Sequence, residues 1–129
     1  MKVLILGASG IVGQHMRLCV PVGVDPVWVR READQITLGY WESEPVVADY
    51  DAVVYLMGNS NVDDVERNPA NARMLNTEWP KMMAAHCQQN NVKFIQVSSQ
   101  AVYQSPGNNM DQPNVYGRQK RAAEVSTLE

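Results

Sequence analysis

Two side chains near the end of the chain have the types and the spacing that acid–base chemistry needs. Tyr116 and Lys120 lie four residues apart in the segment NVYGRQKRAAEVSTLE (114–129). Side chains at this spacing share one face of a helix. A free phenol has a pKa of about 10, and a nearby ammonium group favours the phenolate and lowers that pKa. The pair could therefore exchange a proton with a bound substrate, and a chance helical pair is the alternative.

A glycine-rich segment, GASGIVG (7–13), has the properties of an anion-binding turn. It follows the apolar run KVLIL (2–6) and precedes a helical pattern at 11–20. Glycines allow a tight turn and the close approach of a pyrophosphate, and a helix N-terminus supplies N–H groups to that anion. We predict a dinucleotide site here, with an unliganded glycine-rich turn as the alternative. The predicted contacts are Gly7, Ser9, Gly10, Ile11, Val12 and Gly13.

The end of the next predicted strand indicates which dinucleotide would bind. At this position an acidic residue favours NAD, whereas an arginine favours the 2′-phosphate of NADP. Arg30 and Arg31 end the strand PVWVRR (26–31), and Glu32 follows them directly. The sequence therefore favours NADP, with NAD as the second candidate, and an ordinary solvated arginine pair is the alternative.

Alternating strand and helix patterns position these residues. Short apolar runs predict strands at 2–6, 26–31, 35–41, 51–58 and 92–99. Helical patterns lie at 11–20, 68–91 and 115–129, and Pro80 should kink or divide the second of them. The short connection 42–50 should form a single turn or an irregular crossing. The pattern predicts an α/β fold with a doubly wound, Rossmann-like parallel sheet of about five strands in the order 3-2-1-4-5.

The composition excludes several classes of protein. The chain has 129 residues, of which 45% are hydrophobic and 19% charged, as expected for one globular domain. Its net charge of −3 gives no electrostatic basis for binding nucleic acid or an anionic membrane. We expect no membrane span and no metal site. Cys19 and Cys87 lie in helical patterns and are expected to be reduced core thiols, which favours a cytoplasmic location.

Five motifs, in order along the chain, resemble the extended short-chain dehydrogenase/reductase group, the NAD(P)-dependent sugar epimerase, dehydratase and reductase family. They are GASGIVG (7–13), DAVVYLMG (51–58), Asn76, VSSQAVY (97–103) and YGRQK (116–120). The resemblance also implies cofactor contacts at Leu56, Met57, Gly58, Val97 and Lys120.

The same resemblance implies roles for three side chains. Ser99 would hold the substrate oxygen, Tyr116 would act as general acid or base, and Lys120 would hydrogen-bond the nicotinamide ribose. Ser98 is the alternative to Ser99 if the strand register shifts by one residue. The alternative for Asn76 is a structural, backbone-bonding role.

The chain is shorter than members of this group. Their further strands and C-terminal lobe form most of the sugar-nucleotide pocket, so we expect 1–129 to be a dinucleotide-binding domain whose substrate lobe is absent. We expect cofactor binding with little turnover by this chain alone, in chemistry at a nucleotide-sugar hydroxyl or carbonyl. Two alternatives stay open. One is a natural short protein that binds a dinucleotide or a partner without turnover, and the other is a homodimer through 68–90 and 115–129 that completes the site.

Overall fold

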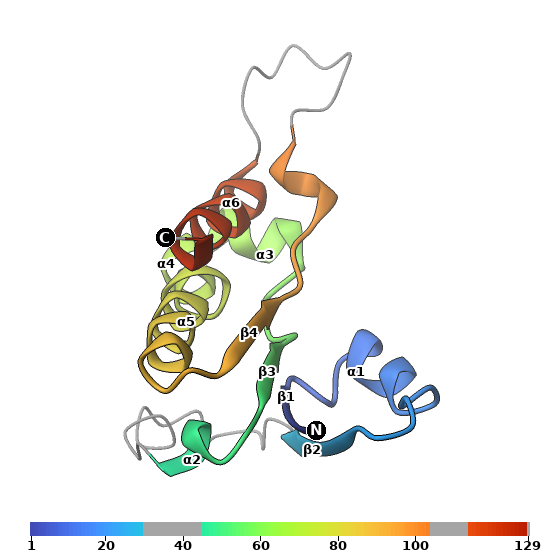
Figure 1. Cartoon of the computed structure of the whole chain (residues 1–129). Helices are drawn as coiled ribbons and strands as arrows, with labels where there is room; N and C mark the ends of the chain where they lie inside the picture. The colour runs from blue at the N-terminus through green and yellow to red at the C-terminus, as the bar shows by residue number, and fades with distance from the viewer. Residues whose placement is uncertain (30–44, 104–113, 129) are drawn as a thin grey trace. The chain divides into compact units, whose positions relative to one another are not determined.

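The computed structural model describes residues 1–29, 45–103 and 114–128. The chain forms two compact units, Met1–Met57 with Ala84–Ile95, and Gly58–Met83 with Gln96–Glu129. The first unit is built on a parallel β-sheet. The second is mainly helical, and Figure 1 shows the elements of both.

The sheet has the strand order β2-β1-β3-β4. Its strands are β1 (Lys2–Leu6), β2 (Asp25–Val29), β3 (Ala52–Tyr55) and β4 (Lys93–Gln96). The central strand β1 pairs in parallel with β2 on one side and with β3 on the other. These four strands confirm the predicted order, although β3 and β4 are shorter than predicted. The strand predicted at 35–41 lies outside the described residues.

Both faces of this sheet are apolar. One face carries Val3, Ile5, Ala52 and Val54, against which the partly buried Met16, Val24, Trp28 and Leu56 pack. The alternate positions of β1 and β3 are fully buried as well, and they are Leu4, Leu6, Val53 and Tyr55. Successive side chains of a strand point to opposite faces, so these near-continuous apolar runs produce a sheet covered on both sides.

Helix α1 (Ile11–Met16) ends earlier than predicted. After Met16 the chain turns through hydrogen bonds from Leu18 N–H to His15 O and from Cys19 N–H to Met16 O. Cys19 is exposed, so its prediction as a core thiol was wrong: the helix ends at Met16, before it reaches Cys19. Cys87 is buried as expected, and burial raises the pKa of its thiol to about 11. The short connection before β3 contains one helical turn, α2 (Pro45–Ala48), as expected.

The long helical pattern at 68–91 is divided by a proline. It forms α4 (Pro69–Arg73), a π-helical segment η2 (Met74–Glu78) and α5 (Trp79–Gln89), preceded by a separate helix α3 (Val62–Arg67). The N–H of Trp79 donates to the carbonyl of Met74, five residues earlier. Pro80 has no N–H to donate, and its ring would clash with the carbonyl of Asn76 in a regular α-helix. The widened turn before Pro80 relieves that conflict. The described residues also form a 3₁₀ turn, η3 (Gln100–Val102), and the helix α6 (Val115–Leu128).

The turn from β1 to α1 depends on close packing around two glycines. Gly7 has φ +94°, and a Cβ there would lie 2.9 Å from the backbone nitrogen of Met57. A Cβ on Gly13 would lie 2.7 Å from Ala8 Cα and 2.8 Å from the Gly7 carbonyl oxygen. These contacts are with backbone atoms, which cannot move aside as a flexible side chain can.

We expect Gly13→Ala to destabilise the chain by about 1–3 kcal/mol, because the overpacking outweighs the roughly 1 kcal/mol that alanine gains in a helix. Urea denaturation measures this free energy. Gly10→Ser is the matched control, since a Cβ at Gly10 meets only the Gly7 carbonyl oxygen at 3.5 Å and serine is a favoured N-cap. Gly13→Ala as stable as the unmodified chain would contradict the packing argument.

Candidate functional site

The glycine loop of the first unit presents an open backbone at the start of α1. Gly10 is the N-cap, with φ −72° and ψ 168°, a conformation that any residue adopts. A side chain at Gly10 would make only an ordinary contact, so the fold itself requires glycine at Gly7 and Gly13 but not at Gly10. Close approach of a ligand is the physical reason for a bare backbone at such a position.

The surroundings of Gly10 suit an anion. The first turn of α1 contains no acidic residue, and its first N–H groups have no carbonyl within the helix to receive them. Ser9 is exposed, and its carbonyl oxygen accepts a hydrogen bond from Gln14 Nε2 at 2.7 Å. Ile11 is 79% exposed and Val12 is exposed too, so apolar surface borders the loop.

Leu56 and Met57, which follow β3, are the nearest backbone neighbours of Gly7. The predicted loop contacts and these two residues thus belong to one unit. Arg30 and Arg31 lie outside the described residues, so their contact with a 2′-phosphate stays a prediction.

In the second unit, Lys120 of α6 is held inside the protein. Its side chain is 6% exposed, and its Nζ donates a hydrogen bond to the Val97 carbonyl oxygen at 2.8 Å. Burial lowers the pKa of the Lys120 ammonium, and the negative charge of Glu124 opposes that change. An ammonium has three donors, so further N–H groups of Lys120 can serve a ligand.

The two candidate serines have different partners. Ser99 precedes η3, and its Oγ accepts a hydrogen bond from the Ala101 N–H at 3.2 Å, which leaves the hydroxyl hydrogen to donate elsewhere. Ser98 instead donates its hydroxyl to a carboxylate oxygen of Glu124. Ser98 is thus engaged with α6, and the role of Ser99 toward a substrate stays a prediction.

Tyr116 lies in the first turn of α6, which is anchored at its start. The Asn114 side chain accepts the Gly117 N–H at 2.8 Å, and Glu66 of α3 accepts the Val115 N–H at 2.7 Å. These bonds satisfy N–H groups that a helix start leaves unpaired, so the backbone that carries Tyr116 is fixed. The second unit therefore contains all three predicted catalytic residues.

A buried amide network lies next to Lys120, and one of its members, Gln119, was missed from the sequence. Asn76, which is 0% exposed, accepts the Asn59 N–H at 2.8 Å and donates to the Asn59 carbonyl and to Gln119 Oε1, both at 3.0 Å. Gln119 Nε2 donates to the Pro69 carbonyl at 2.8 Å, and Thr77 Oγ1 donates to the Gln119 carbonyl at 2.9 Å. Asn76 thus has the backbone-bonding role given above as its alternative. The only signal in the sequence was an amide beside the predicted lysine.

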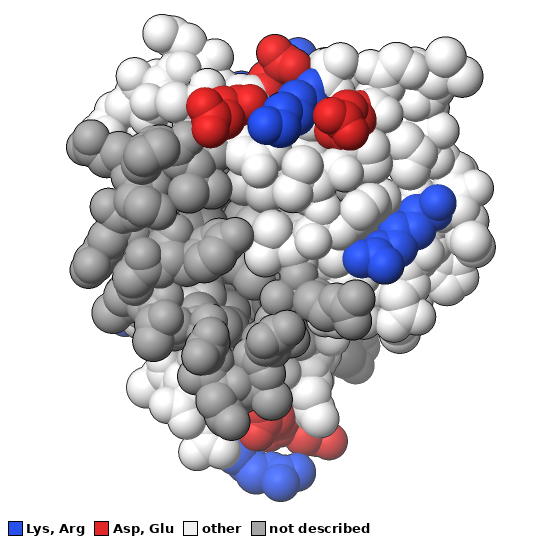
Figure 2. All heavy atoms as spheres, turned by 90° about the horizontal axis from the view of Figure 1, so that it is seen from below, with Lys and Arg blue, Asp and Glu red and all other residues white. Residues whose placement is uncertain are grey.

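In the ranges 1–29, 45–103 and 114–128, no group of three or more His, Cys, Asp or Glu residues could hold a metal ion. None of the helices in these ranges is both long and apolar enough to span a membrane. On the face seen in Figure 2, described acidic and basic side chains are interspersed.

A parallel sheet with a glycine-rich turn after its central strand defines an α/β fold of the Rossmann type. The family model described as the RmlD substrate binding domain matches residues 1–129. The chain belongs to this family, and the structures it resembles are sugar reductases and epimerases of the extended short-chain dehydrogenase/reductase group.

Solved structures share the fold at low identity. The dTDP-4-dehydrorhamnose reductase from Bacillus anthracis, solved with NADP, is 22% identical with a TM-score of 0.81, covering 98% of this chain and 49% of that chain. The dTDP-4-dehydrorhamnose reductase from Yersinia enterocolitica is 24% identical with a TM-score of 0.76, covering 98% of this chain and 47% of that chain. The UDP-Glc/GlcNAc 4-epimerase from Campylobacter jejuni is 22% identical with a TM-score of 0.75, covering 96% of this chain and 47% of that chain. The chain spans about half the length of these proteins. The comparison with curated proteins gave no match.

We expect Asn76→Ala to lower the free energy of unfolding by about 2–4 kcal/mol, since it leaves the Asn59 backbone groups and Gln119 Oε1 without a partner in a buried site. Urea denaturation of both variants is the measurement. The exposed Asn71 of α4 is the control, and Asn71→Ala should change stability by less than about 0.5 kcal/mol. Equal effects of the two substitutions would show that the network contributes little.

The lowered pKa of Lys120 predicts a pH dependence of stability. Between that pKa and the ordinary value of 10.5, the unfolded chain holds more protons than the folded one, so this lysine's contribution to stability rises with pH. We expect the free energy of unfolding of the unmodified chain, minus that of Lys120→Met, to rise with pH above the lowered pKa of Lys120 and to level off above pH 10.5. The exposed Lys81, replaced in Lys81→Met, should show no such trend. A flat difference for Lys120→Met would refute the assignment.

Proposed function

We propose that this chain is the dinucleotide-binding part of an NAD(P)-dependent enzyme that acts on a hydroxyl or carbonyl of a nucleotide sugar. The observation that carries the proposal is Gly10, a glycine that the fold does not require, at the start of a helix without acidic residues in its first turn. Membership in the RmlD substrate binding domain family supports the same conclusion, because related folds were solved as complexes with dinucleotides.

The chain's own residues would bind the cofactor in two places. The loop from Gly7 to Gly13 would receive the pyrophosphate on its N–H groups, with Leu56 and Met57 alongside. Gly58, Val97 and Lys120 would contact the nicotinamide half. Arg30 and Arg31 favour NADP over NAD. The NADP complex of the Bacillus anthracis reductase and the NADPH complex of RMD from Pseudomonas aeruginosa support that choice, whereas MoeE5 was solved with NAD.

A bound nicotinamide supplies hydride transfer, and the residues of this chain would manage the proton. The Tyr116 hydroxyl would give a proton to, or take one from, the substrate oxygen. The Lys120 ammonium would stabilise the Tyr116 phenolate and donate to the ribose. The Ser99 hydroxyl, whose oxygen already accepts the Ala101 N–H, would donate to the substrate oxygen.

We also infer a cytoplasmic protein whose partners are small molecules and a second copy of itself rather than nucleic acid. The helices at 68–90 and 115–129 carry exposed apolar side chains that support a homodimer, which sedimentation velocity tests. These side chains are Met74, Met82, Val125 and Leu128.

Binding of NADP is the direct test. A dinucleotide at about 100 times its dissociation constant should stabilise the chain by roughly 2.7 kcal/mol, measured by thermal or urea denaturation. Gly10→Ser should fold normally and lose most of this stabilisation, because its side chain occupies the space a pyrophosphate needs. Tyr116→Phe is the matched control, and the dinucleotide should stabilise this variant as much as the unmodified chain.

Three outcomes would revise the proposal. Absence of stabilisation by both NADP and NAD would refute dinucleotide binding, and stabilisation by NAD alone would refute the role of Arg30 and Arg31. We expect little turnover from this chain alone. Reduction of a sugar-nucleotide ketone that is lost in Tyr116→Phe would contradict that expectation.

A further inference from the structure

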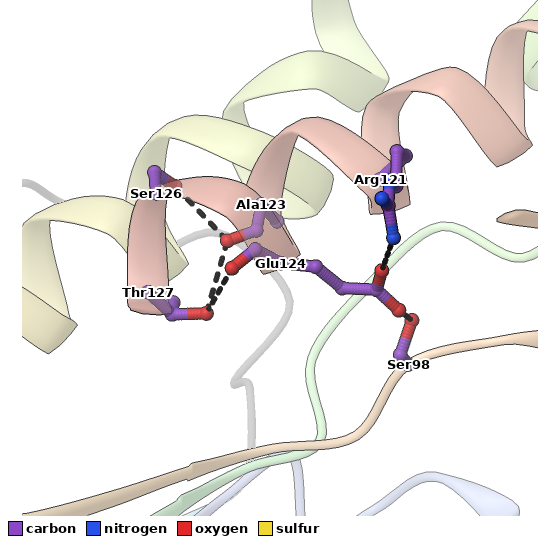
Figure 3. A network of polar contacts seen from close by, with 6 residues as sticks. All are labelled: Ser98, Arg121, Ala123, Glu124, Ser126 and Thr127. Atoms are coloured by element: carbon purple, nitrogen blue, oxygen red, sulfur yellow. Dashed lines mark hydrogen bonds and ion pairs between the residues drawn. The ribbon is translucent and has the colours of Figure 1, made fainter. Parts of the chain in front are cut away.

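Glu124 of α6 binds a residue of the segment that follows β4. One oxygen of its carboxylate accepts the Ser98 hydroxyl at 2.5 Å, and the other accepts a hydrogen bond from Arg121 at 3.1 Å. Figure 3 shows these two contacts on opposite oxygens of the same side chain. The Glu124 side chain is 23% exposed, whereas that of Arg121 is 61% exposed. An exposed ion pair contributes little, so the bond to Ser98 is the more important contact.

This contact is one of two that hold consecutive residues. Lys120 donates to the Val97 carbonyl, and Glu124, one helical turn further along the same face of α6, accepts from Ser98. Ser99 follows immediately and forms the N-cap of η3. Fixing the Val97 carbonyl and the Ser98 side chain therefore fixes the backbone from which Ser99 extends.

We propose that Glu124 is a positioning residue for the acid–base groups, because its bond to Ser98 holds residues 97–99 in place. The Val97 carbonyl then keeps its hydrogen bond to the Lys120 ammonium, and Ser99 keeps its position at the start of η3. The proposal rests on the roles proposed above for Ser99 and Lys120. It also explains why two serines stand together here, since Ser98 anchors the segment and Ser99 is left for substrate. The Glu124 charge acts in the same direction, because it opposes the loss of charge that burial imposes on Lys120.

Chemical labelling of Lys120 tests this proposal without any ligand. Limited acetylation of the full chain, followed by mass spectrometry, gives a rate for each lysine, with the exposed Lys2, Lys81 and Lys93 as internal references. We expect Lys120 to react more slowly than these three, because its amine is buried and bound to Val97.

The variants separate the two bonds of Glu124. Loss of one hydrogen bond of about 1 kcal/mol should raise the Lys120 labelling rate about fivefold in Ser98→Ala. Glu124→Ala should raise the rate by at least as much, because it also removes the charge that favours the unreactive ammonium. The double variant should show no rise beyond that of Glu124→Ala, since both substitutions remove the same hydrogen bond. Ser98→Thr keeps the hydroxyl and should restore the slow rate, and Arg121→Ala should leave it unchanged. NADP affinity should fall in the same two single variants.

Several results would overturn the proposal. Unchanged labelling of Lys120 in both single variants would show that the Ser98 bond positions nothing. An effect of Arg121→Ala equal to that of Glu124→Ala would assign the role to the ion pair instead. Ser98 is exposed, so Ser98→Ala should fold even if Glu124→Ala does not. Failure of the unmodified chain to bind a dinucleotide would refute the proposed function but would not change the expected labelling rates.

Discussion

A buried pair of side-chain amides, Asn76 and Gln119, is the interaction on which the second unit depends. Burying an amide without partners is costly, and here both amides have backbone or side-chain partners for their oxygen and nitrogen atoms. The network joins the Asn59 backbone, the start of α4 and the middle of α6. Because Lys120 directly follows Gln119, the position of Gln119 fixes the rotation of α6 about its axis and thereby turns Lys120 inward.

The π-helical segment makes this network geometrically feasible. Asn76 and Thr77 are consecutive, yet Asn76 donates to the Gln119 side chain and Thr77 to the Gln119 carbonyl. Neighbouring residues of a regular α-helix point about 100° apart, and a widened turn changes that arrangement. Pro80 explains why the turn is widened here. Pro80, which interrupts the helical pattern in the sequence, is thus linked through the widened turn to the bonds of Gln119, the residue before the proposed catalytic Lys120.

Local patterns were enough to predict the sheet but not the contacts of the site. Apolar runs that end at Gly7 and Gly58 predicted β1 and β3, because a buried strand followed by a glycine turn can be recognised from neighbouring residues in the sequence. The prediction that Cys19 lies in the core was wrong, because helical spacing alone does not show where a helix ends. The Gln119 bonds span 42 to 50 residues, so no local pattern could reveal them. The roles of Ser99, Tyr116, Lys120, Arg30 and Arg31 stay predictions.

Lys120 is subject to two opposing influences, burial and the charge of Glu124, and in the proposed mechanism their balance bears on Tyr116. Burial favours the neutral amine, which would leave the phenol of Tyr116 without a positive neighbour. Glu124 favours the ammonium, and the Val97 carbonyl accepts one of its hydrogens. Since Glu124 is also bound to Ser98, the carboxylate that favours the charged form of Lys120 is the one that contacts the segment leading to Ser99. The proposed positioning of residues 97–99 and the electrostatic support of the Lys120 ammonium therefore depend on the same carboxylate.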